Sequence, residues 1–414
     1  MKVLINAYAI SPDWGSEQGV GWNWIISIAR HCELFVITEE EYRDRIEAAL
    51  DRLPQGRYIH MYYHPVPERV RRMCWNQGDW RFYFHYARWQ RQILPIARRI
   101  VAENGIDIIH MLNMVGFREP GYLWRIKGLP YVWGPVAGNE MLDLKFLSDE
   151  SCASRVKYWI KNVITRIQME YSCRVAMVFK HSDAIITPVG SFSEHIVAKY
   201  RKIPYLISET GLENGCVPAA MADTKHGPGL DMMWVGRFVK RKKLDIALKT
   251  LAALPSDHDV RLHIVGFGMN DEDRYYRAMA ESLGVTDKCI WYGKLPNDET
   301  RKLMSEMDLL LFTSIHEATS TVVPEAIQAR LPIVCHDICG FGPLIDDSIG
   351  RKIPLVSPEE SVKGFASIIS DFCIHRDMLV DMKPNFDKVA ESLTYESKGR
   401  KVFEIYENLL QHKI

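Results

Sequence analysis

The sequence predicts an α/β protein with two parallel-sheet domains in series, each covered by helices. Short apolar runs alternate with longer helix-like stretches in both halves of the 414-residue chain, which is the pattern of βαβ units and of a doubly wound sheet. This length allows two or three domains with full hydrophobic cores. Hydrophobic residues make up 47% and charged residues 25% of the chain, a globular mixture that excludes disordered, collagen-like and coiled-coil proteins.

Apolar runs of strand length mark the first domain. Between them lie longer stretches with room for the crossover helices that parallel strands require. The expected strands are residues 2–8, 33–38, 58–63, 106–112, 129–133 and 183–187, and the expected helices are residues 16–30, 40–53 and 86–104.

The same alternation returns in the second half. The expected strands are residues 231–235, 260–265, 289–292, 308–313 and 331–335, and the expected helices are residues 243–254, 272–283, 298–306 and 321–330. A final amphipathic helix is expected over residues 394–412, because its apolar residues recur at helical spacing.

Glycine, proline and asparagine gather between the two patterns, a composition typical of a linker. We therefore expect a first Rossmann-like domain over residues 1–208, a linker over 209–230, a second Rossmann-like domain over 231–392 and a C-terminal helical segment over 393–414.

The charge of the chain sums to zero but is unevenly distributed. Lys and Arg number 52, as do Asp and Glu, which argues against a dedicated nucleic-acid-binding protein. Residues 1–207 carry 27 basic and 21 acidic side chains, so the two halves have net charges of +6 and −6. The nine cysteines are irregularly spaced, as expected of reduced thiols in the cytoplasm. No apolar run reaches the roughly 20 residues of a transmembrane helix.

A cluster of cations follows the expected strand at 231–235. The loop Gly236-Arg237-Phe238-Val239-Lys240-Arg241-Lys242-Lys243 contains five of them. Ligands of open α/β sheets bind at the carboxyl ends of the strands, and Arg together with Lys suits a diphosphate whose negative charge grows as it leaves. A solvated lysine-rich turn before the next helix would have the same composition, so both readings stay open here.

Two carboxylates frame a second loop, which leads from the strand at 308–313 into the helix at 321–330. Glu317 precedes that helix and Glu325 lies within it, so the pair could accept hydrogen bonds from sugar or ribose hydroxyls on two sides of one ligand. Ser320 or Thr321 is a natural N-cap, and the amides that follow are donors for an anion. A glutamate pair at this spacing is a weak signal when taken alone.

Taken together, the motifs of this chain resemble glycosyltransferase family 4, whose fold is GT-B. The resemblance covers nearly the whole sequence and depends on the order of the motifs. They are Gly15-Ser16-Glu17-Gln18-Gly19, Asp107-Ile108-Ile109-His110, Gly134-Pro135-Val136-Ala137-Gly138, Ser182-Asp183-Ala184-Ile185-Ile186-Thr187-Pro188, Glu213-Asn214-Gly215, Gly236-Arg237 with Lys242, Val265-Gly266-Phe267-Gly268, and Glu317-x7-Glu325.

The resemblance implies two domains facing a central cleft, with the C-terminal helix packing back on the first domain. It also implies a retaining transfer of a sugar from a nucleoside-diphosphate sugar, held by the second domain, to an acceptor held by the first. Arg237 and Lys242 would neutralise the leaving diphosphate, and Glu317 would hold the sugar hydroxyls. The remaining donor-binding residues would be Gly236, Gly266, Gly268, Tyr292, Gly293, Thr319, Ser320, Thr321, Val322 and Glu325.

In relatives the later of two histidines at the end of this strand lies near the reacting carbon, and this chain has Leu112 there. The resemblance therefore makes His110 the candidate for that catalytic role, although a lone histidine at a strand end is more often a structural group. Gly15, Glu17 and Gly19 would touch the donor phosphate or the acceptor, although a helix-opening turn would explain the same residues. Asn113 and Gly138 are candidates for acceptor binding. No metal and no cofactor are expected, because the cations replace a metal and the sugar nucleotide is a substrate.

Several positions depart from the family pattern. Relatives often have a second histidine where this chain has Leu112. Ala318-Thr319-Ser320-Thr321 replaces a glycine-rich run, and Lys243 replaces a common glycine. The details of phosphate binding therefore stay open.

Residues 66–101 contain eight arginines interleaved with aromatic residues. Such a mixture suits the headgroup region of an anionic membrane, whereas a partly buried helix with solvated arginines would look the same. No nucleic-acid recognition motif accompanies it.

We expect a cytoplasmic glycosyltransferase, peripheral at the inner membrane face, that builds a surface polysaccharide or glycolipid on a glycan or lipid-linked acceptor. The alternatives are a sugar-nucleotide epimerase or phosphorylase of the same fold and a non-catalytic sugar-nucleotide-binding partner.

Overall fold

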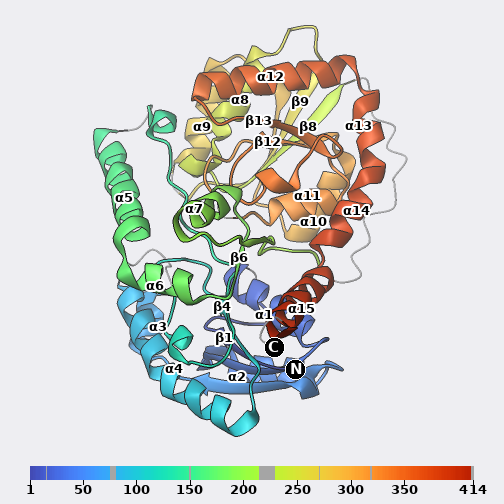
Figure 1. The fold of residues 1–414 in the computed structure, drawn as a ribbon. Coiled ribbons are helices and arrows are strands. Elements are labelled where there is room, and N and C mark those ends of the chain that lie inside the picture. Colours follow the sequence, from blue (N-terminus) through green and yellow to red (C-terminus); the bar gives the residue numbers. More distant parts are fainter. Residues whose placement is uncertain are drawn as a thin grey trace. The chain divides into compact units, whose positions relative to one another are not determined.

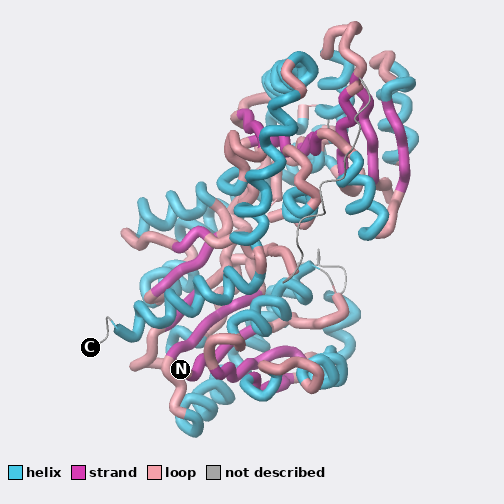
Figure 2. The backbone as a smooth tube through the Cα atoms, turned by 90° about the vertical axis from the view of Figure 1, so that its right-hand side faces the viewer, coloured by secondary structure: helices cyan, strands magenta, loops and turns pink. Residues whose placement is uncertain are grey.

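A computed structural model describes residues 1–14, 16–74, 81–148, 151–213, 229–269, 271–317 and 319–411. Packing divides the chain into two compact units. The first unit consists of Met1–Asn139, Val163–Asn214 and Thr394–Ile414, and the second consists of Glu140–Asn162 and Gly215–Leu393. Each unit contains one parallel sheet with its helices (Figures 1 and 2).

The first unit has a seven-stranded sheet in the order β3-β2-β1-β4-β5-β6-β7. All neighbouring strands are parallel. The strands are β1 (Lys2–Ala7), β2 (Glu33–Glu39), β3 (Ile59–His64), β4 (Ile108–Asn113), β5 (Tyr131–Trp133), β6 (Ala184–Thr187) and β7 (Tyr205–Leu206). The helices are α1 (Ser16–Ile28), α2 (Arg43–Leu50), α3 (Glu68–Cys74), α4 (Phe82–Asn104), α6 (Cys173–His181), α7 (Gly190–Tyr200) and α15 (Tyr395–Gln411).

The core of the first unit joins the two ends of the chain. Val3 and Ile5 of β1 pack in one buried cluster with Trp24 of α1 and with Val402 and Tyr406 of α15. The apolar side chains of α15 therefore belong to the core of the first unit. The expectation that the last helix packs on the first domain is confirmed.

The second unit has a six-stranded sheet in the order β10-β9-β8-β11-β12-β13, again parallel throughout. The strands are β8 (Leu230–Val235), β9 (Val260–Val265), β10 (Cys289–Gly293), β11 (Leu309–Phe312), β12 (Ile333–His336) and β13 (Gly350–Ile353). The helices are α8 (Leu244–Ala253), α9 (Glu272–Ser282), α10 (Asn297–Glu306), α11 (Val322–Gln328), α12 (Pro358–Ile374), α13 (Asp377–Met382) and α14 (Phe386–Leu393).

Every apolar run chosen from the sequence forms a strand, and the predicted fold class is confirmed. Two strands were not predicted. β7 is short and exposed, and β13 (Gly-Arg-Lys-Ile) has no apolar run.

One segment belongs to a different unit from the one expected from a domain boundary at residue 208. Glu140–Asn162 lies within residues 1–208 but packs with the second unit. Two backbone carbonyls of this segment hold it there, because Phe146 O accepts a hydrogen bond from Lys243 Nζ at 3.2 Å and Glu140 O lies 3.0 Å from His316 Nε2. The segment includes the first half of α5 (Cys152–Tyr171), a helix that the apolar runs did not mark.

Candidate functional site

The carboxyl ends of β8 and β11 meet at the point where the strand order of the second sheet reverses. From β8 the chain proceeds to β9 and β10 on one side, whereas β11 lies on the other side. Such switch points are where ligands of open α/β sheets bind. Thr313, after β11, fixes the two loops together, because its Oγ1 donates to the carbonyls of Lys242 and Lys243 at 2.8 and 2.9 Å.

Glu317 forms ion pairs with two cations of the loop after β8. Its Oε1 lies 2.8 Å from Arg241 Nη1 and 2.5 Å from Lys242 Nζ, and it also accepts from Ser314 Oγ at 3.1 Å. Burial lowers the pKa of the Lys242 ammonium, and the adjacent Glu317 carboxylate opposes that shift. The loop after β8 therefore forms a nearly buried ion pair with Glu317. The other carboxylate oxygen of Glu317, Oε2, takes no part in these contacts.

Arg237 differs from Arg241 and Lys242, which are both paired with Glu317. Its side chain is exposed, and within the described ranges it makes no hydrogen bond or ion pair. Gly236 before it packs against the stem of Lys242, where an added Cβ would lie 3.3 Å from Lys242 Cδ. The absence of a side chain at residue 236 thus allows Lys242 to run beneath the turn while Arg237 faces solvent.

Lys243 has a backbone conformation that glycine adopts more readily than other residues. Its φ is +52°, in the left-handed region. The side chain is buried, with Nζ 2.9 Å from Asp245 Oδ2 and bonded to Phe146 O. This lysine therefore has two local partners and holds the Glu140–Asn162 segment.

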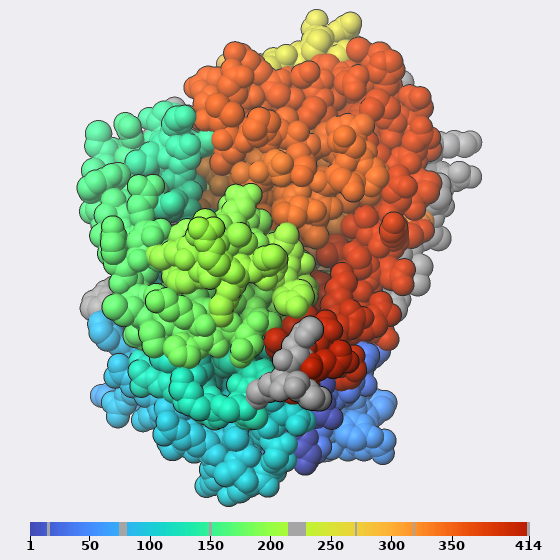
Figure 3. All heavy atoms as spheres, in the orientation of Figure 1, coloured from blue at the N-terminus to red at the C-terminus, as the bar shows by residue number. Residues whose placement is uncertain are grey.

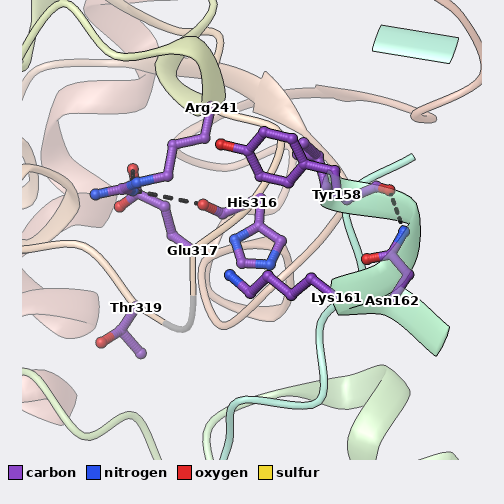
Figure 4. A pocket seen from close by; sticks show the side chains of 8 residues that line it. Tyr158, Lys161, Asn162, Arg241, His316, Glu317 and Thr319 are labelled. Atoms are coloured by element: carbon purple, nitrogen blue, oxygen red, sulfur yellow. Dashed lines mark hydrogen bonds and ion pairs between the residues drawn. The ribbon is translucent and has the colours of Figure 1, made fainter. Parts of the chain in front are cut away.

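A pocket of about 490 Å³ opens beside Glu317, and all of its lining residues belong to the second unit. They are Leu142, Tyr158, Lys161, Asn162, Arg241, His316, Glu317 and Thr319. Figure 4 shows Tyr158, Lys161 and Asn162 coming from α5 and facing the loop that carries His316 and Glu317. Asn162 Nδ2 donates to Leu142 O at 2.7 Å, which fixes the amide at the wall of the pocket.

His316 lies between the two walls of this pocket (Figure 4). Burial lowers the pKa of its imidazole, opposed by its contact with the Glu140 carbonyl. We expect a neutral ring at neutral pH, with Nε2 donating to that carbonyl.

The segment before α11 lies partly in the pocket and partly outside it. Thr319 lines the pocket, Ser320 is buried, and Val322 begins α11. Thr321 occupies the N-cap position as expected, but its side chain makes no capping hydrogen bond. Ala318 lies outside the described residues.

Glu325 is the second carboxylate of the predicted pair. Burial raises its pKa, against the opposing charges of Arg301 and Lys242. In the part of the chain that the structure describes, its carboxylate makes no hydrogen bond. It is therefore an acceptor within the electrostatic range of Lys242.

The predicted glycines gather at the ends of β8, β9 and β10. Gly266 N donates to Gly293 O at 2.8 Å, and Gly236 N donates to Val265 O at 3.0 Å. Gly266 has φ +155°, and an added Cβ would lie 1.8 Å from Gly236 O, so only glycine allows this close approach. Gly268 follows, with its N–H bonded to Asp273 Oδ2 at 2.9 Å.

Tyr292 lies at the exposed edge strand of this sheet. Its hydroxyl is 2.9 Å from His263 Nδ1, and His263 Nε2 is 2.9 Å from Asp231 Oδ1. The phenol of Tyr292 is therefore held by this chain of polar contacts along the sheet. The backbone at Gly293 lies beside Gly266, whose N–H it accepts.

The first unit has its own switch point, between β1 and β4. There Glu17 Oε1 accepts from Val115 N at 2.7 Å, and burial raises the pKa of this carboxyl, opposed by that N–H. Asn113 bonds the backbone of Ala9 through both ends of its amide, at 3.3 and 2.6 Å.

The other predicted glycines of the first unit fall into two groups. An added Cβ at Gly19 would lie 2.2 Å from Trp14 O, so Gly19 allows the start of α1 to pack against the preceding loop. Gly138 accepts a hydrogen bond from Arg118 Nη1 at 3.0 Å through its carbonyl. Gly15 lies outside the described residues.

His110 is fully buried in the first unit. Its Nδ1 contacts the hydroxyl of Tyr406 on α15, and its Nε2 lies 2.6 Å from Gly134 O. Burial lowers the pKa of this imidazole to about 4, so the ring is neutral at neutral pH. Both ring nitrogens are occupied, which places His110 in the packing of α15 rather than with the polar groups at Glu17.

Sequence reasoning missed the wall that α5 contributes, namely Tyr158, Lys161 and Asn162. Nothing in their spacing connects them with a loop more than a hundred residues away in the chain. Arg241 and His316 were visible beside Lys242 and Glu317, but no motif singled them out. Among the described residues, no group of three or more His, Cys, Asp or Glu side chains is placed to hold a metal ion.

Comparisons with known proteins point to one family. Residues 224–386 match the family model described as Glycosyl transferases group 1. The lipopolysaccharide glucosyltransferase WaaG of Escherichia coli K12 is 34% identical over 119 residues, which is 28% of this chain and 30% of WaaG. In this sequence match the chain therefore spans less than a third of the relative's length.

Solved structures share the fold over the whole chain. The crystal structure of WaaG superposes with a TM-score of 0.57 at 18% identity, covering 98% of this chain and 99% of that one. The Anabaena protein Alr3699/HepE in complex with UDP gives a TM-score of 0.61 at 14% identity, covering 99% and 100%. The two-sheet architecture of this chain is thus the GT-B fold.

Proposed function

Residues 224–386 form a domain of the glycosyl transferases group 1 family, and on that premise we propose that the chain is a retaining glycosyltransferase. It moves a sugar from a nucleoside-diphosphate sugar to a hydroxyl group of a glycan or lipid-linked acceptor. The observation that carries this proposal is the pairing of Arg241 and Lys242 with Glu317 at the switch point of the second sheet, with the exposed Arg237 in the same loop.

The diphosphate is assigned to the cations. Arg237 is exposed and has two parallel donors for phosphate oxygens. Lys242 adds a fixed positive charge in a nearly buried position, where a charge acts more strongly than in water. As the bond to the sugar breaks, negative charge grows on the diphosphate and these groups stabilise it. They carry the role for which other enzymes use a divalent metal.

The sugar and the ribose are assigned to the two carboxylates. Oε1 of Glu317 is engaged by Arg241, Lys242 and Ser314, which leaves Oε2 to accept from the sugar hydroxyls. Glu325 accepts from the ribose hydroxyls. The backbone of Tyr292 and Gly293 meets the base, Gly236, Gly266 and Gly268 allow close approach, and Thr319, Ser320, Thr321 and Val322 surround the phosphate.

Transfer with retention needs few protein groups. The bond between the anomeric carbon and the diphosphate oxygen breaks, with its electron pair going to that oxygen. The acceptor oxygen then bonds to the anomeric carbon on the same face, and its proton passes to the departing phosphate oxygen. This internal proton transfer needs no protein base.

The acceptor is assigned to the first unit. Glu17, Asn113 and Gly138 lie near the carboxyl ends of its strands, where ligands of such sheets bind. The burial of His110 between Tyr406 and Gly134 favours a structural role over direct participation.

We propose a lipid-linked acceptor and work at the cytoplasmic face of a membrane, in surface polysaccharide or glycolipid synthesis. On α4, Arg88, Arg98 and Arg99 are exposed without an ion pair in the described ranges. Tyr83 and Phe84 beside them are exposed, whereas Tyr86 and Trp89 are buried. No helix of the described chain is long and apolar enough to span a bilayer.

Donor binding is tested by thermal unfolding with UDP, GDP and ADP, their monophosphates and their sugar conjugates. A nucleotide at one hundred times its Kd adds about 2.7 kcal/mol, or about 5–10 °C for a domain of this size. We expect a diphosphate to stabilise more than the matching monophosphate, with or without a chelator. If none of the diphosphates shifts the transition, the proposal is wrong.

A further inference from the structure

The pocket beside Glu317 has more basic than acidic groups around it. Among the described residues that line it, Lys161 and Arg241 are cations and Glu317 is the one acid. The charge of this acid is already balanced, because its Oε1 lies 2.8 Å from Arg241 Nη1 and 2.5 Å from Lys242 Nζ. Lys161 therefore adds a positive charge to a pocket whose carboxylate has two cationic partners.

The charge of Lys161 acts inside the pocket. Its side chain extends from α5 past the ring of His316 (Figure 4). Burial lowers the pKa of the His316 imidazole, and the charges of Lys161 and Arg241 lower it further, against the hydrogen bond to the Glu140 carbonyl. A positive potential therefore reaches the interior of the pocket from two of its walls, one on α5 and one on the loop after β8.

The other lining groups suit a sugar ring. Leu142 and the ring of Tyr158 offer apolar surface for its C–H groups. Asn162 Nδ2 is bonded to Leu142 O at 2.7 Å, so the amide is fixed and its oxygen can accept from a sugar hydroxyl. The volume of about 490 Å³ falls within the range of roughly 300–1,000 Å³ that small-molecule sites occupy. The pocket thus combines the size and polarity of a sugar site with an added positive charge.

The pocket lies on the Arg241 side of Glu317. Lys242, to which the leaving diphosphate is assigned, contacts the same carboxylate oxygen but is not among the described lining residues. A donor with its diphosphate at Lys242 and its sugar hydroxyls at Glu317 Oε2 therefore extends its sugar toward Arg241 and Lys161.

We propose that the donor sugar carries a carboxylate, as in the nucleoside-diphosphate uronic acids, and that Lys161 and Arg241 bind this group. The inference rests on the proposed transfer reaction and specifies its donor. A neutral sugar offers only hydroxyl groups to the two cations, whereas a carboxylate accepts charge-assisted hydrogen bonds, which are about twice as strong. An amino sugar would bring a third cation beside them, at a cost in affinity.

Lys161 can be changed with little effect on the fold. It is exposed, and Figure 3 shows atoms of α5 on the visible surface, in teal to green. Lys161→Met removes the charge and keeps a good helix former, whereas Lys161→Arg keeps the charge. The matched control is Lys157→Met, which removes an exposed lysine of the same helix outside the described lining of the pocket.

The test is calorimetric titration of the full chain with pairs of sugar nucleotides that differ only in a carboxylate or a hydroxymethyl group at sugar carbon 5. The pairs are UDP-glucuronate with UDP-glucose, UDP-galacturonate with UDP-galactose, and GDP-mannuronate with GDP-mannose. We expect the uronate of one pair to bind about tenfold more tightly than its neutral partner, as a hydrogen bond between charged groups allows. Lys161→Met should abolish this preference, whereas Lys161→Arg and Lys157→Met should retain it.

Three results would overturn the inference. The neutral sugar nucleotide could bind as tightly as the uronate in every pair, or Lys157→Met could abolish the preference as Lys161→Met does. Lys161→Met could also weaken binding of bare UDP or GDP as much as binding of the uronate, which would assign Lys161 to the diphosphate. In all three cases a nucleoside diphosphate still binds and the proposed transfer stands. If none of these nucleotides binds, the proposed function fails together with the inference.

Discussion

Arg237 and Lys242 follow the same strand, but only Lys242 has a carboxylate partner, Glu317. We expect Arg237→Ala to lower kcat by about 10²–10³-fold, as loss of one group that stabilises transition-state charge does elsewhere, with little effect on stability because the side chain is exposed. Steady-state kinetics with the donor found by thermal shift measures this. The control is Lys388→Ala, an exposed lysine on α14 of the same unit. Equal kinetics for the two variants would remove Arg237 from the site.

The Lys242–Glu317 pair predicts a coupling in stability. A double-mutant cycle with Lys242→Met and Glu317→Gln, measured by urea unfolding, should give about 1–3 kcal/mol. Glu317→Gln leaves the charged Lys242 nearly buried without its partner, whereas Lys242→Met leaves Glu317 with Arg241 and Ser314 alone. The exposed pair Lys363–Glu360, 3.1 Å apart, is the control and should give at most about 0.5 kcal/mol. Equal coupling in the two cycles would contradict this account.

At the residue scale, the positions of the site residues could be predicted better in the second unit than in the first. Gly236, Lys242 and Glu317 could be predicted because their chemistry is fixed by the loops that carry them. His110 stands at a strand end, but the alternation of a buried strand does not show that α15 will cover it with Tyr406. Tyr158 and Lys161 reach their pocket through tertiary packing alone.

At the element scale, α15 depends on a buried polar contact. Tyr406→Phe removes the partner of His110 Nδ1, so we expect a loss of about 1–3 kcal/mol in the free energy of unfolding, with kcat unchanged. Urea unfolding and kinetics test this, with the exposed Tyr205→Phe as control. A large loss of kcat in a normally stable Tyr406→Phe protein would instead give His110 a part in the reaction.

Lys398, also on α15, predicts a pH dependence. It is buried and bonds Thr210 O, and burial lowers its pKa to about 7. Between that value and its ordinary pKa the unfolded chain binds a proton that the folded chain does not, so stability rises with pH there.

The free energy of unfolding of the wild type should therefore rise relative to that of Lys398→Met between about pH 7 and pH 9. The rise should be at most about 1.4 kcal/mol per pH unit. Urea unfolding across this range measures the difference, and exposed Lys401→Met on the same helix is the control. Parallel pH curves for the wild type and Lys398→Met would contradict the shift.

Strands were easier to predict than the helices outside the regular alternation. Buried parallel strands are continuous apolar runs, and all such runs chosen here form strands. β13 has only its ends buried and thus no such run. α5 lies in the long connection between the expected strands at 129–133 and 183–187, and its large apolar side chains are exposed rather than in the core.

At the scale of the molecule, the zero net charge is the sum of two unlike halves. The basic half contains the exposed arginines of α4, whereas the acidic half places Arg241 and Lys242 around Glu317. We assign the first group to an anionic membrane surface and the second to a diphosphate.

The most direct test of the central claim is the anomeric configuration of the first product formed from an α-linked nucleoside-diphosphate sugar, followed by proton NMR. The donor is the sugar nucleotide that most stabilises the fold, with water or a lipid-linked glycan as acceptor. We predict an α-configured product and release of the nucleoside diphosphate, both formed much more slowly by Arg237→Ala and Glu317→Gln. A β-configured first product, or a tightly bound donor that is never consumed, would contradict it.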